Sequence, residues 1–433
     1  MTPLIDPRGL ATGSPSRQAI EQLERALQSM LSYFDDPVAL LQQTIALAPS
    51  WAYPRVLLAS LLMTLTERGA ARQAAAALAD AQGLLAGALP RERAHAVAAQ
   101  ALVDGDWARA CQLWETILVD NPTDIAALLF AHLFDFFRGD ALNLRRRPQR
   151  VLPAWRPDMP LHGYVLGMQA FGLEECGQYP RAEDLGRQAL ALNPRDPWSV
   201  HAVTHVMEMQ GRHAEGARWL AERQRDWAVD NGMSYHNWFH AALFEMEDMN
   251  TVAALAIFDA RLAASTETAL QRVDGTAGLW RLKLLDVDVA ARFQGLHAAW
   301  QAVPDADGFY AFNDVHAALA ALGADQPAPP VREAPAGEVT QRLMAERVGA
   351  PLQQALADYG RGRYADAVRG LLQVRDRAHE FGGSHAQRDL LNWTLLDAAL
   401  RAGEPALARH LLNERLPEKR DTPLTAHWLR RLP

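Results

Sequence analysis

Apolar residues recur at helical spacing along almost the whole chain, and Gly, Pro or Asp turns interrupt them about every 12 to 18 residues. Hardly any stretch shows the alternation of Val, Ile or Thr with polar residues that is typical of a half-buried strand. The pattern therefore predicts an all-α protein.

Several of these helical stretches resemble one another. The stretch GQYPRAEDLGRQALALNPRD begins at Gly177, GRHAEGARWL begins 34 residues later at Gly211, and GDWARACQLWETILVDNPTD begins at Gly105, 72 residues before Gly177. Less regular copies begin at Gly362 and Gly403. A period of about 34 residues is typical of the tetratricopeptide repeat, in which antiparallel helix pairs stack into a right-handed superhelix. We therefore expect an α-solenoid of this kind.

The interruptions predict how the chain is organised. We expect a single helical-repeat superhelix over residues 1–433, preceded at its start by an extended arm over residues 1–18. Residues 145–160, RRRPQRVLPAWRPDMP, are predicted to form a proline-broken loop, and the Pro/Ala-rich residues 324–337 a second loop before the last helices.

Composition and charge limit the classes of partner that the chain is expected to bind. The 433 residues are 49% apolar, and 43 Lys and Arg stand against 51 Asp and Glu, which gives a net charge of −8. This balance disfavours nucleic acid and anionic membranes as partners. Cys111 and Cys176 cannot build a disulfide framework, the stretch MTPLIDPRGLATGSPS lacks the pattern of a secretion signal, and no apolar run is long enough to span a membrane. These features predict a cytoplasmic protein.

One row of polar residues has the composition of a catalytic or metal-binding site. In SVHAVTHVMEM, His201 and His205 are four residues apart and Glu208 follows three later, so all three lie on one face of a helix. His236 and His240 repeat the pair 35 residues further on, about one repeat later. If the repeat register holds, the four imidazoles converge in the concave groove of the superhelix.

Further polar residues recur at about the same repeat period. Asp274 follows His240 by 34 residues, and His132, with Asp135 on the same predicted helix, precedes His201 by about two periods. Gly167 stands one period before His201, where the missing side chain would leave space over the site.

The stretches DPWSVHAVTHVMEMQGR, HNWFHAALFEMED, LWRLKL, FNDVHAALA and GGSHAQRDLLNWTLL together resemble the tetratricopeptide repeat protein 38 family over most of the chain. The resemblance implies the repeat fold and singles out the two His pairs, but it implies no particular reaction. His385 stands where Asn is expected. The residues in the other matching motifs are Trp280, Arg281, Asp314, His316, Gln387, Arg388 and Asp389.

Two kinds of chemistry suit the histidines. Imidazoles four residues apart can bind one divalent transition metal, zinc or iron, with a carboxylate from Glu208 or Asp274 completing an open site. Without a metal, crowded neutral imidazoles can transfer protons near pH 7. In either case Arg281 and Arg388 could hold a carboxylate or phosphate of a substrate.

Each of these features also has a structural explanation. A His pair at this spacing is more often hydrogen-bonded within a fold than bound to a metal, and no HExxH motif is present. Trp198, Trp238 and Trp280 could stack on a substrate or pack between helices, whereas Ser384 is expected to cap a helix.

We expect a protein that binds, and through metal-assisted or His acid/base chemistry converts, a small polar molecule with a carboxylate or amide group. The alternative is a scaffold that binds a peptide or protein partner in the groove, without catalysis. The candidate catalytic residues are His201, His205, Glu208, His236, His240 and His316. The candidate metal ligands are His201, His205, His236 and His240. The candidate substrate-binding residues are His132, Asp135, Trp238, Asp274, Trp280, Arg281, Asp314, Gln387 and Arg388.

Overall fold

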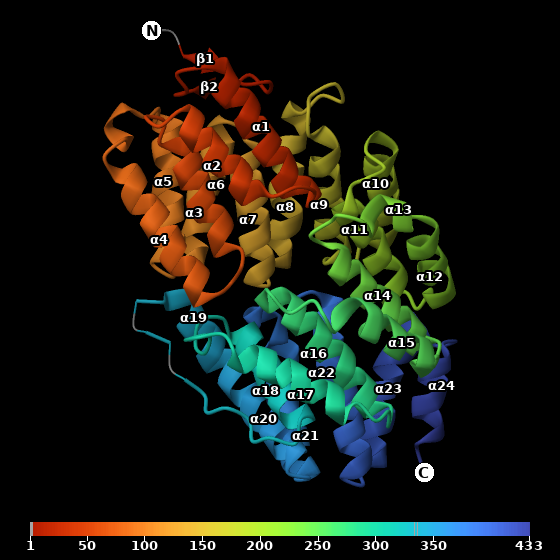
Figure 1. The fold of residues 1–433 in the computed structure, drawn as a ribbon. Coiled ribbons are helices and arrows are strands. Elements are labelled where there is room, and N and C mark those ends of the chain that lie inside the picture. The colour runs from red at the N-terminus through yellow and green to blue at the C-terminus, as the bar shows by residue number, and fades with distance from the viewer. Residues whose placement is uncertain (1–2, 333, 336) are drawn as a thin grey trace. The chain divides into compact units, whose positions relative to one another are not determined.

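The computed structural model describes residues 3–332, 334–335 and 337–433. Helices make up nearly all of the regular structure in these residues, and the named strands are two short ones near the start, β1 (Leu4–Ile5) and β2 (Ala11–Thr12) (Figure 1). The predicted all-α fold class is confirmed.

The chain forms two compact units. Unit 1 comprises Met1–Val203, Val229–Met233 and Ala336–Thr340, and unit 2 comprises Thr204–Ala228, Ser234–Pro335 and Gln341–Pro433. The division falls within two helices, α11 (Pro197–Met209) and α19 (Val339–Met344). The expectation of one continuous superhelix stays a prediction.

Unit 1 consists of helices that follow one another as packed neighbours, joined by short turns. The closest pairs are α3 with α4, α5 with α6, and α9 with α10, as expected for antiparallel helix hairpins. Its helices are α1 (Arg17–Ser32), α2 (Pro37–Leu47), α3 (Tyr53–Met63), α4 (Arg68–Gln82), α5 (Pro90–Val103), α6 (Trp107–Asp120), α7 (Ile125–Phe137), α8 (Ala141–Val151), α9 (His162–Glu174) and α10 (Tyr179–Leu192).

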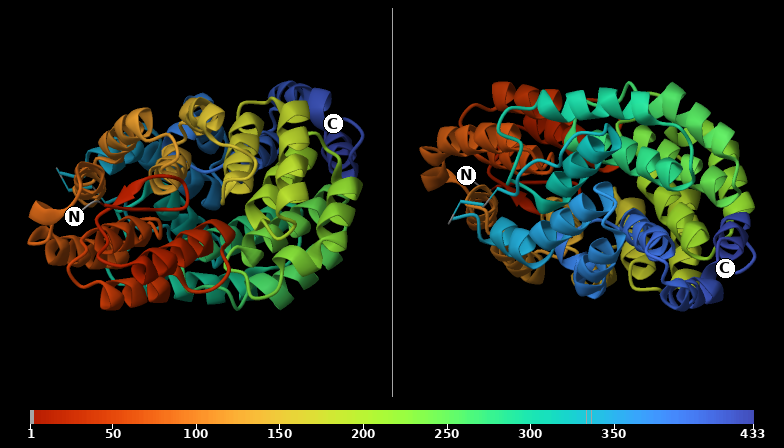
Figure 2. Two further views of the ribbon diagram at one scale, coloured as in Figure 1. Left: turned by 90° about the horizontal axis from the view of Figure 1, so that it is seen from above. Right: turned by 90° about the horizontal axis from the view of Figure 1, so that it is seen from below.

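Unit 2 is built in the same way, and Figure 2 shows from two further sides that successive helices lie side by side within each unit. In addition, α22 packs back on α16 and α24 on α14, although these helices are far apart in the sequence. The helices of unit 2 are α12 (His213–Glu222), α13 (Gln224–Trp227), α14 (Ser234–Glu247), α15 (Thr251–Ile257), α16 (Ala269–Leu284), α17 (Ala290–Gln301), α18 (Ala311–Gly323), α20 (Ala350–Gly360), α21 (Tyr364–Val374), α22 (His385–Arg401), α23 (Pro405–Lys419) and α24 (Pro423–Arg430).

Shorter helical turns complete both units. Three are 3-10 turns and two are π-helical turns. The 3-10 turns are Leu85–Gly87, Leu152–Ala154 and Arg375–Phe381, and the π-helical turns are Phe258–Leu262 and Ala345–Gly349.

The turn glycines of the repeats end the first helix of each pair. Gly105, Gly177 and Gly211 have φ values of 81°, 70° and 68°, in the left-handed region where a side chain would be strained. Acidic N-caps start several of the following helices, since Asp106 accepts the N–H of Arg109 and Asp124 that of Ala127. The repeats recognised in the sequence are thus bounded by ordinary helix signals.

Residues 145–160 differ from the expected proline-broken loop. Helix α8 continues to Val151 with Pro148 inside it, and a 3-10 turn follows to Ala154. Pro148 cannot donate to the carbonyl of Leu144, and Gly172 of α9 lies so close that a Cβ would stand 2.4 Å from that oxygen. The helix therefore tolerates the proline because a glycine packs against the altered turn.

The other two irregular segments have little regular structure. Residues 3–16 are extended or turned apart from β1 and β2, which pair antiparallel with Leu4 opposite Thr12. The described residues of 324–337 contain no helix or strand. Within the described ranges, every helix is too short or too polar to cross a lipid bilayer.

Candidate metal and ligand site

Helices α11 and α14 carry the histidines. Asp196 caps α11 by accepting the N–H groups of Trp198 at 3.0 Å and Ser199 at 3.2 Å. The helix then runs without a break to Met209, which keeps His205 and Glu208 on one face. Helix α14 places His236 and His240 one turn apart in the same way.

Three imidazoles of unit 2 form a tight cluster. His205, His236 and His240 each offer a ring nitrogen within 4.8 Å of the others. The ring of His240 lies 4.6 Å from that of His205 and 4.8 Å from that of His236, measured between centroids. His205 and His240 are fully buried, while His236 is partly exposed. The predicted histidine cluster is therefore present.

In two of these rings, those of His236 and His240, Nδ1 lies within hydrogen-bond distance of a carboxylate. Nδ1 of His240 lies 2.7 Å from Oε2 of Glu208, and Nδ1 of His236 lies 2.6 Å from Oδ2 of Asp274. An ionised carboxylate only accepts hydrogen bonds, so with Glu208 and Asp274 ionised the proton of each neutral imidazole is on Nδ1. The lone pair of each ring is then on Nε2.

The two Nε2 atoms of His236 and His240 face each other at 3.3 Å. Two lone pairs at this distance repel unless a proton or a cation lies between them. Zinc bound tetrahedrally at about 2.0 to 2.1 Å separates two ligand nitrogens by about 3.3 Å. A carboxylate on the far nitrogen of a ligand histidine is also the usual support of a metal site. The donor set and its spacing therefore fit a divalent transition metal.

Burial and neighbouring charges favour the neutral form of His240. Burial, the other two imidazoles and the Arg281 cation lower the pKa of His240 well below its usual range. Burial raises the pKa of Glu208, although the cations of Lys419 and Arg281 oppose this shift. Arg281 is itself fully buried, and burial lowers its pKa against the carboxylates of Asp389, Glu208 and Asp274. These groups therefore form one coupled set of charges.

His201 lies one turn before His205 on α11, in the part of the helix that belongs to unit 1. Its ring is buried 5.3 Å from that of Phe171 and 5.2 Å from that of Trp198, between centroids. Helical spacing keeps His201 and His205 on the same face.

Two cavities lie within unit 2, and Glu208 lines the smaller one. A cavity of about 220 Å³ is lined by Trp393, Asp389, Arg415 and Lys419, among others. Asp389, Trp393 and Lys419 also line a second, water-sized cavity, of which Glu208 and Arg281 form another part of the wall. The larger cavity combines cations, carboxylates and an indole, which suits a small polar ligand.

Two arginines expected to hold a substrate donate to the main chain. Arg281 donates from Nη2 to the carbonyl of Ala386 at 2.6 Å and from Nη1 to that of Ala277 at 3.2 Å. Arg388 donates to the carbonyl of Gly383. Both guanidinium groups therefore fix the start of α22, since each bonds the chain at or near that helix.

Gln387 and Ser384 form the cap of α22. The amide oxygen of Gln387 accepts the N–H of Ser384 at 3.0 Å, and Oγ of Ser384 accepts the N–H of Gln387 at 3.2 Å. Asp314 likewise accepts the N–H of Gly308 at 3.1 Å and closes the turn before α18. The contacts of these residues stabilise helix starts.

The remaining candidates of unit 2 lie in the packing between helices. Trp280 is buried and donates from Nε1 to Oγ1 of Thr394 at 3.0 Å, while Trp238 packs edge-on against Trp227. His316 is buried and donates from Nδ1 to the carbonyl of Phe312, 2.8 Å away. Burial lowers the pKa of His316 to about 4, with a smaller contribution from Arg281.

Three residues expected to extend the site belong to unit 1. Asp135 is buried and accepts from Nε of Arg147 at 2.8 Å, which joins α7 to α8. Burial lowers the pKa of His132 to about 3. The space expected over Gly167 is filled, because a Cβ there would lie 2.4 Å from Oγ of Ser199 and 3.1 Å from Oδ2 of Asp196. That expectation was wrong: the glycine allows close packing of α9 on α11.

Sequence reasoning missed Lys419, Arg415 and Asn237. Lys419 and Arg415 lie in an irregular stretch of α23 without repeat spacing, so no pattern connects them with α11. Asn237 directly follows His236 and is fully buried, and in the described part of the chain its amide has no hydrogen-bond partner. Its position beside a candidate ligand was the available signal.

No family model matches the chain, and known proteins are similar to it only over part of their length or at low sequence identity. The chain is 30% identical over 187 residues to Cellulose synthase 2 operon protein C of Komagataeibacter xylinus, a match that covers 39% of this chain and only 14% of that protein. This chain therefore corresponds to a small part of that relative.

Among solved structures, the chain is similar to human IFIT1 in its dimer with m7Gppp-AAAA, with 13% identity, a TM-score of 0.45 and coverage of 97% of this chain and 95% of that one. It is also similar to a chain of the APC/C hetero-tetramer Cut9–Hcn1, with 11% identity, a TM-score of 0.41 and coverage of 97% and 78%. The chain is a helical-repeat protein of tetratricopeptide-like helix pairs.

Proposed function

We propose that His205, His236 and His240 bind one divalent transition metal, zinc or iron, and that His201 supplies a fourth imidazole. The protein would use this site to bind and convert a small polar molecule with a carboxylate or amide group. We include the chain in the tetratricopeptide repeat protein 38 family, on the five motifs that it shares with that family.

The observation that carries the proposal is the pair of Nε2 atoms 3.3 Å apart, each on a ring whose Nδ1 contacts a carboxylate. A purely structural His pair would be expected to satisfy both nitrogens with different partners. Here His236 and His240 direct the same kind of lone pair towards one point. His201 joins them in the proposal because an imidazole one turn away on a continuous helix can reach the ion that His205 binds.

The bound metal would polarise a carbonyl or activate a water molecule. Glu208 and Asp274 fix the tautomer and direction of His240 and His236. Arg281 balances these carboxylates from a buried position, while Lys419 and Arg415 line the larger cavity of unit 2 and would attract a substrate carboxylate there.

Cobalt substitution tests the site directly. We expect the chelator-treated protein to bind Co²⁺ with the visible absorption of a nitrogen-ligated ion, and His236→Ala to abolish that absorption. His410→Ala, at an exposed histidine of α23, is the matched control and should bind Co²⁺ as the unaltered protein does. Absence of these bands in the unaltered protein would refute the metal site.

A second experiment tests conversion. The zinc-loaded and iron-loaded proteins should hydrolyse some members of a panel of small carboxylate-bearing amides and esters, and His236→Ala should not. Metal binding without turnover or ligand binding across the panel would contradict the enzymatic part and favour the alternative, a scaffold that binds a peptide or protein.

A further inference from the structure

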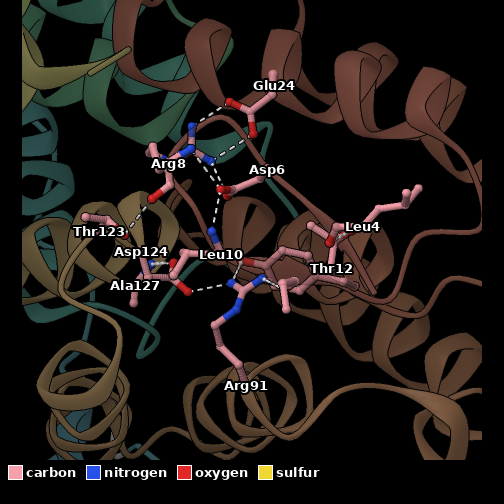
Figure 3. A network of polar contacts seen from close by, with 12 residues as sticks. Leu4, Asp6, Arg8, Leu10, Thr12, Glu24, Arg91, Thr123, Asp124 and Ala127 are labelled. Carbon is pink, nitrogen blue, oxygen red and sulfur yellow. Dashed lines mark hydrogen bonds and ion pairs between the residues drawn. The ribbon is translucent and has the colours of Figure 1, made fainter. Parts of the chain in front are cut away.

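Residues 3–14 of unit 1 form an extended segment that is bound as a peptide ligand would be. Figure 3 shows the side chain of Arg8 between the carboxylates of Asp6 and Glu24. Its Nη1 lies 2.5 Å from Oε2 of Glu24 and its Nη2 lies 2.8 Å from Oε1, a two-pronged ion pair. The Arg8 side chain is only 3% exposed, so this arginine anchors the segment to α1.

The helices hold the rest of the segment mainly through its backbone. Glu92 of α5 accepts the N–H of Gly13 at 2.8 Å, and Arg91 donates to the carbonyl of Ala11 at 3.1 Å. Oγ1 of Thr123 donates to the carbonyl of Arg8 at 3.3 Å. Backbone contacts do not depend on the identity of the side chain, so an extended chain of another sequence could make them too.

Two of the groups that hold the segment, Glu92 and Arg91, are also oriented by contacts that do not involve it. Glu92 also accepts from Nε1 of Trp51 at 2.9 Å, and from the N–H of Leu89 at 3.3 Å. Arg91 donates to Asp124 at 2.6 Å, and its guanidinium lies over the ring of Tyr53. We therefore expect the groove to keep its shape when the segment leaves it.

Two positions restrict which segment fits. Glu24 demands an arginine, whose planar group makes both of its hydrogen bonds. Five residues later, a Cβ on Gly13 would stand 2.5 Å from Oε2 of Glu92, so a larger residue would have to displace this carboxylate and the position favours glycine. An aspartate two residues before the arginine, as Asp6 is here, completes the pattern by bonding the same guanidinium at 2.9 Å.

We propose that Glu24, Arg91, Glu92 and Thr123 form a peptide-binding groove that residues 3–14 occupy within their own chain. Its second ligand is an extended segment of a partner protein with the pattern Asp-x-Arg followed by glycine five residues after the arginine. The partner segment displaces residues 3–14. The proposal uses residues of unit 1 alone and does not depend on the metal site.

Displacement can be measured with a fluorescent synthetic peptide of residues 3–14, PLIDPRGLATGS, and the full chain. Arg8→Ala in the protein weakens its own segment but leaves the groove intact. We expect this variant to bind the peptide at least about tenfold more tightly than the unaltered protein does, since loss of a charged hydrogen-bonded pair costs more than one power of ten. Arg17→Ala, at an exposed arginine, is the control and should match the unaltered protein.

Gly13→Val in the protein should also increase its affinity for the peptide, because it disturbs the other end of the protein's own segment. Peptides that carry Arg8→Ala or Gly13→Val should bind the Arg8→Ala protein at least about tenfold more weakly. Adding Glu24→Gln to this protein should also weaken binding of the parent peptide. Failure of both folded variants to bind the parent peptide, or equal binding of the altered peptides, would overturn the proposal.

Discussion

Two carboxylates determine what the histidines can do. With Glu208 and Asp274 ionised, their carboxylates accept hydrogen bonds from Nδ1 of His240 and His236, and the Nε2 lone pairs of the two rings then face each other. An amide in place of either carboxylate would donate as readily as it accepts and would no longer fix the tautomer. The chemistry of the site therefore depends on residues that do not themselves need to touch the metal.

Glu208→Gln should weaken metal binding by about 10- to 100-fold without unfolding the protein, which is the usual effect of losing such a support. Competition with a chelating dye measures the affinity, and circular dichroism checks the helices. Glu267→Gln, at an exposed carboxylate near the start of α16, is the control. Equal affinities of the two variants would contradict the assigned role of Glu208.

His316 should make folding sensitive to acid. The unfolded chain takes up its proton near pH 6.5, whereas burial lowers the pKa of His316 in the fold to about 4. Stability is therefore complete above pH 6.5 and falls as the pH falls through this window, at up to about 1.4 kcal/mol per pH unit. His316→Asn keeps a donor near the carbonyl of Phe312 and should reduce this slope in urea unfolding. An unchanged slope would contradict the buried neutral imidazole.

The His pairs were predictable because helical spacing and the repeat period both place them. The residues that surround the histidines could be predicted only in part. Glu208 and Asp274 follow the same helical spacing and repeat period, so the sequence could identify them. Gln387 and Arg388 form a helix cap and a bond to a main-chain carbonyl, and their role in binding a substrate stays a prediction. Lys419 comes from a distant helix and follows no period.

At the scale of elements, α14 carries two of the three clustered imidazoles, and α12 holds it in place. Gly216 of α12 packs directly on the ring of Phe244, so that an added Cβ would stand 2.1 Å from its nearest atom. The ring is fully buried and cannot move away without shifting α14. The position of His236 and His240 therefore depends on this contact.

Gly216→Ala should destabilise the protein by about 1 to 3 kcal/mol through overpacking and should also weaken metal binding. Gly295→Ala on α17 is the matched control, because nothing lies within 4 Å of its added Cβ. Alanine there should stabilise the helix by up to about 1 kcal/mol. Urea unfolding compares the two, and equal effects would show that α12 does not hold α14 in this way.

Most elements follow from the sequence, since turn glycines and acidic caps mark the helix ends. The exception at residues 145–160 arose because the cost of a proline inside a helix depends on its neighbours. Gly172 is 24 residues from Pro148 in the sequence, and only packing of α9 on α8 brings it to the carbonyl of Leu144. Tertiary contact here overrides a local signal.

At the scale of the whole molecule, two separate ligand sites are proposed, a metal centre at the histidines of α11 and α14 and a peptide groove in unit 1. A metal that binds only the folded state stabilises it by mass action, in proportion to the logarithm of its concentration. The metal site therefore affects the stability of the protein as well as its chemistry.

Elemental analysis of protein purified without chelator or nickel resin tests the central claim most directly. We predict one zinc or iron ion per chain, and a loss of the metal in His205→Ala/His236→Ala while the helical signal is kept. Equal metal content in the two proteins, or none in either after incubation with zinc and iron, would contradict the metal site.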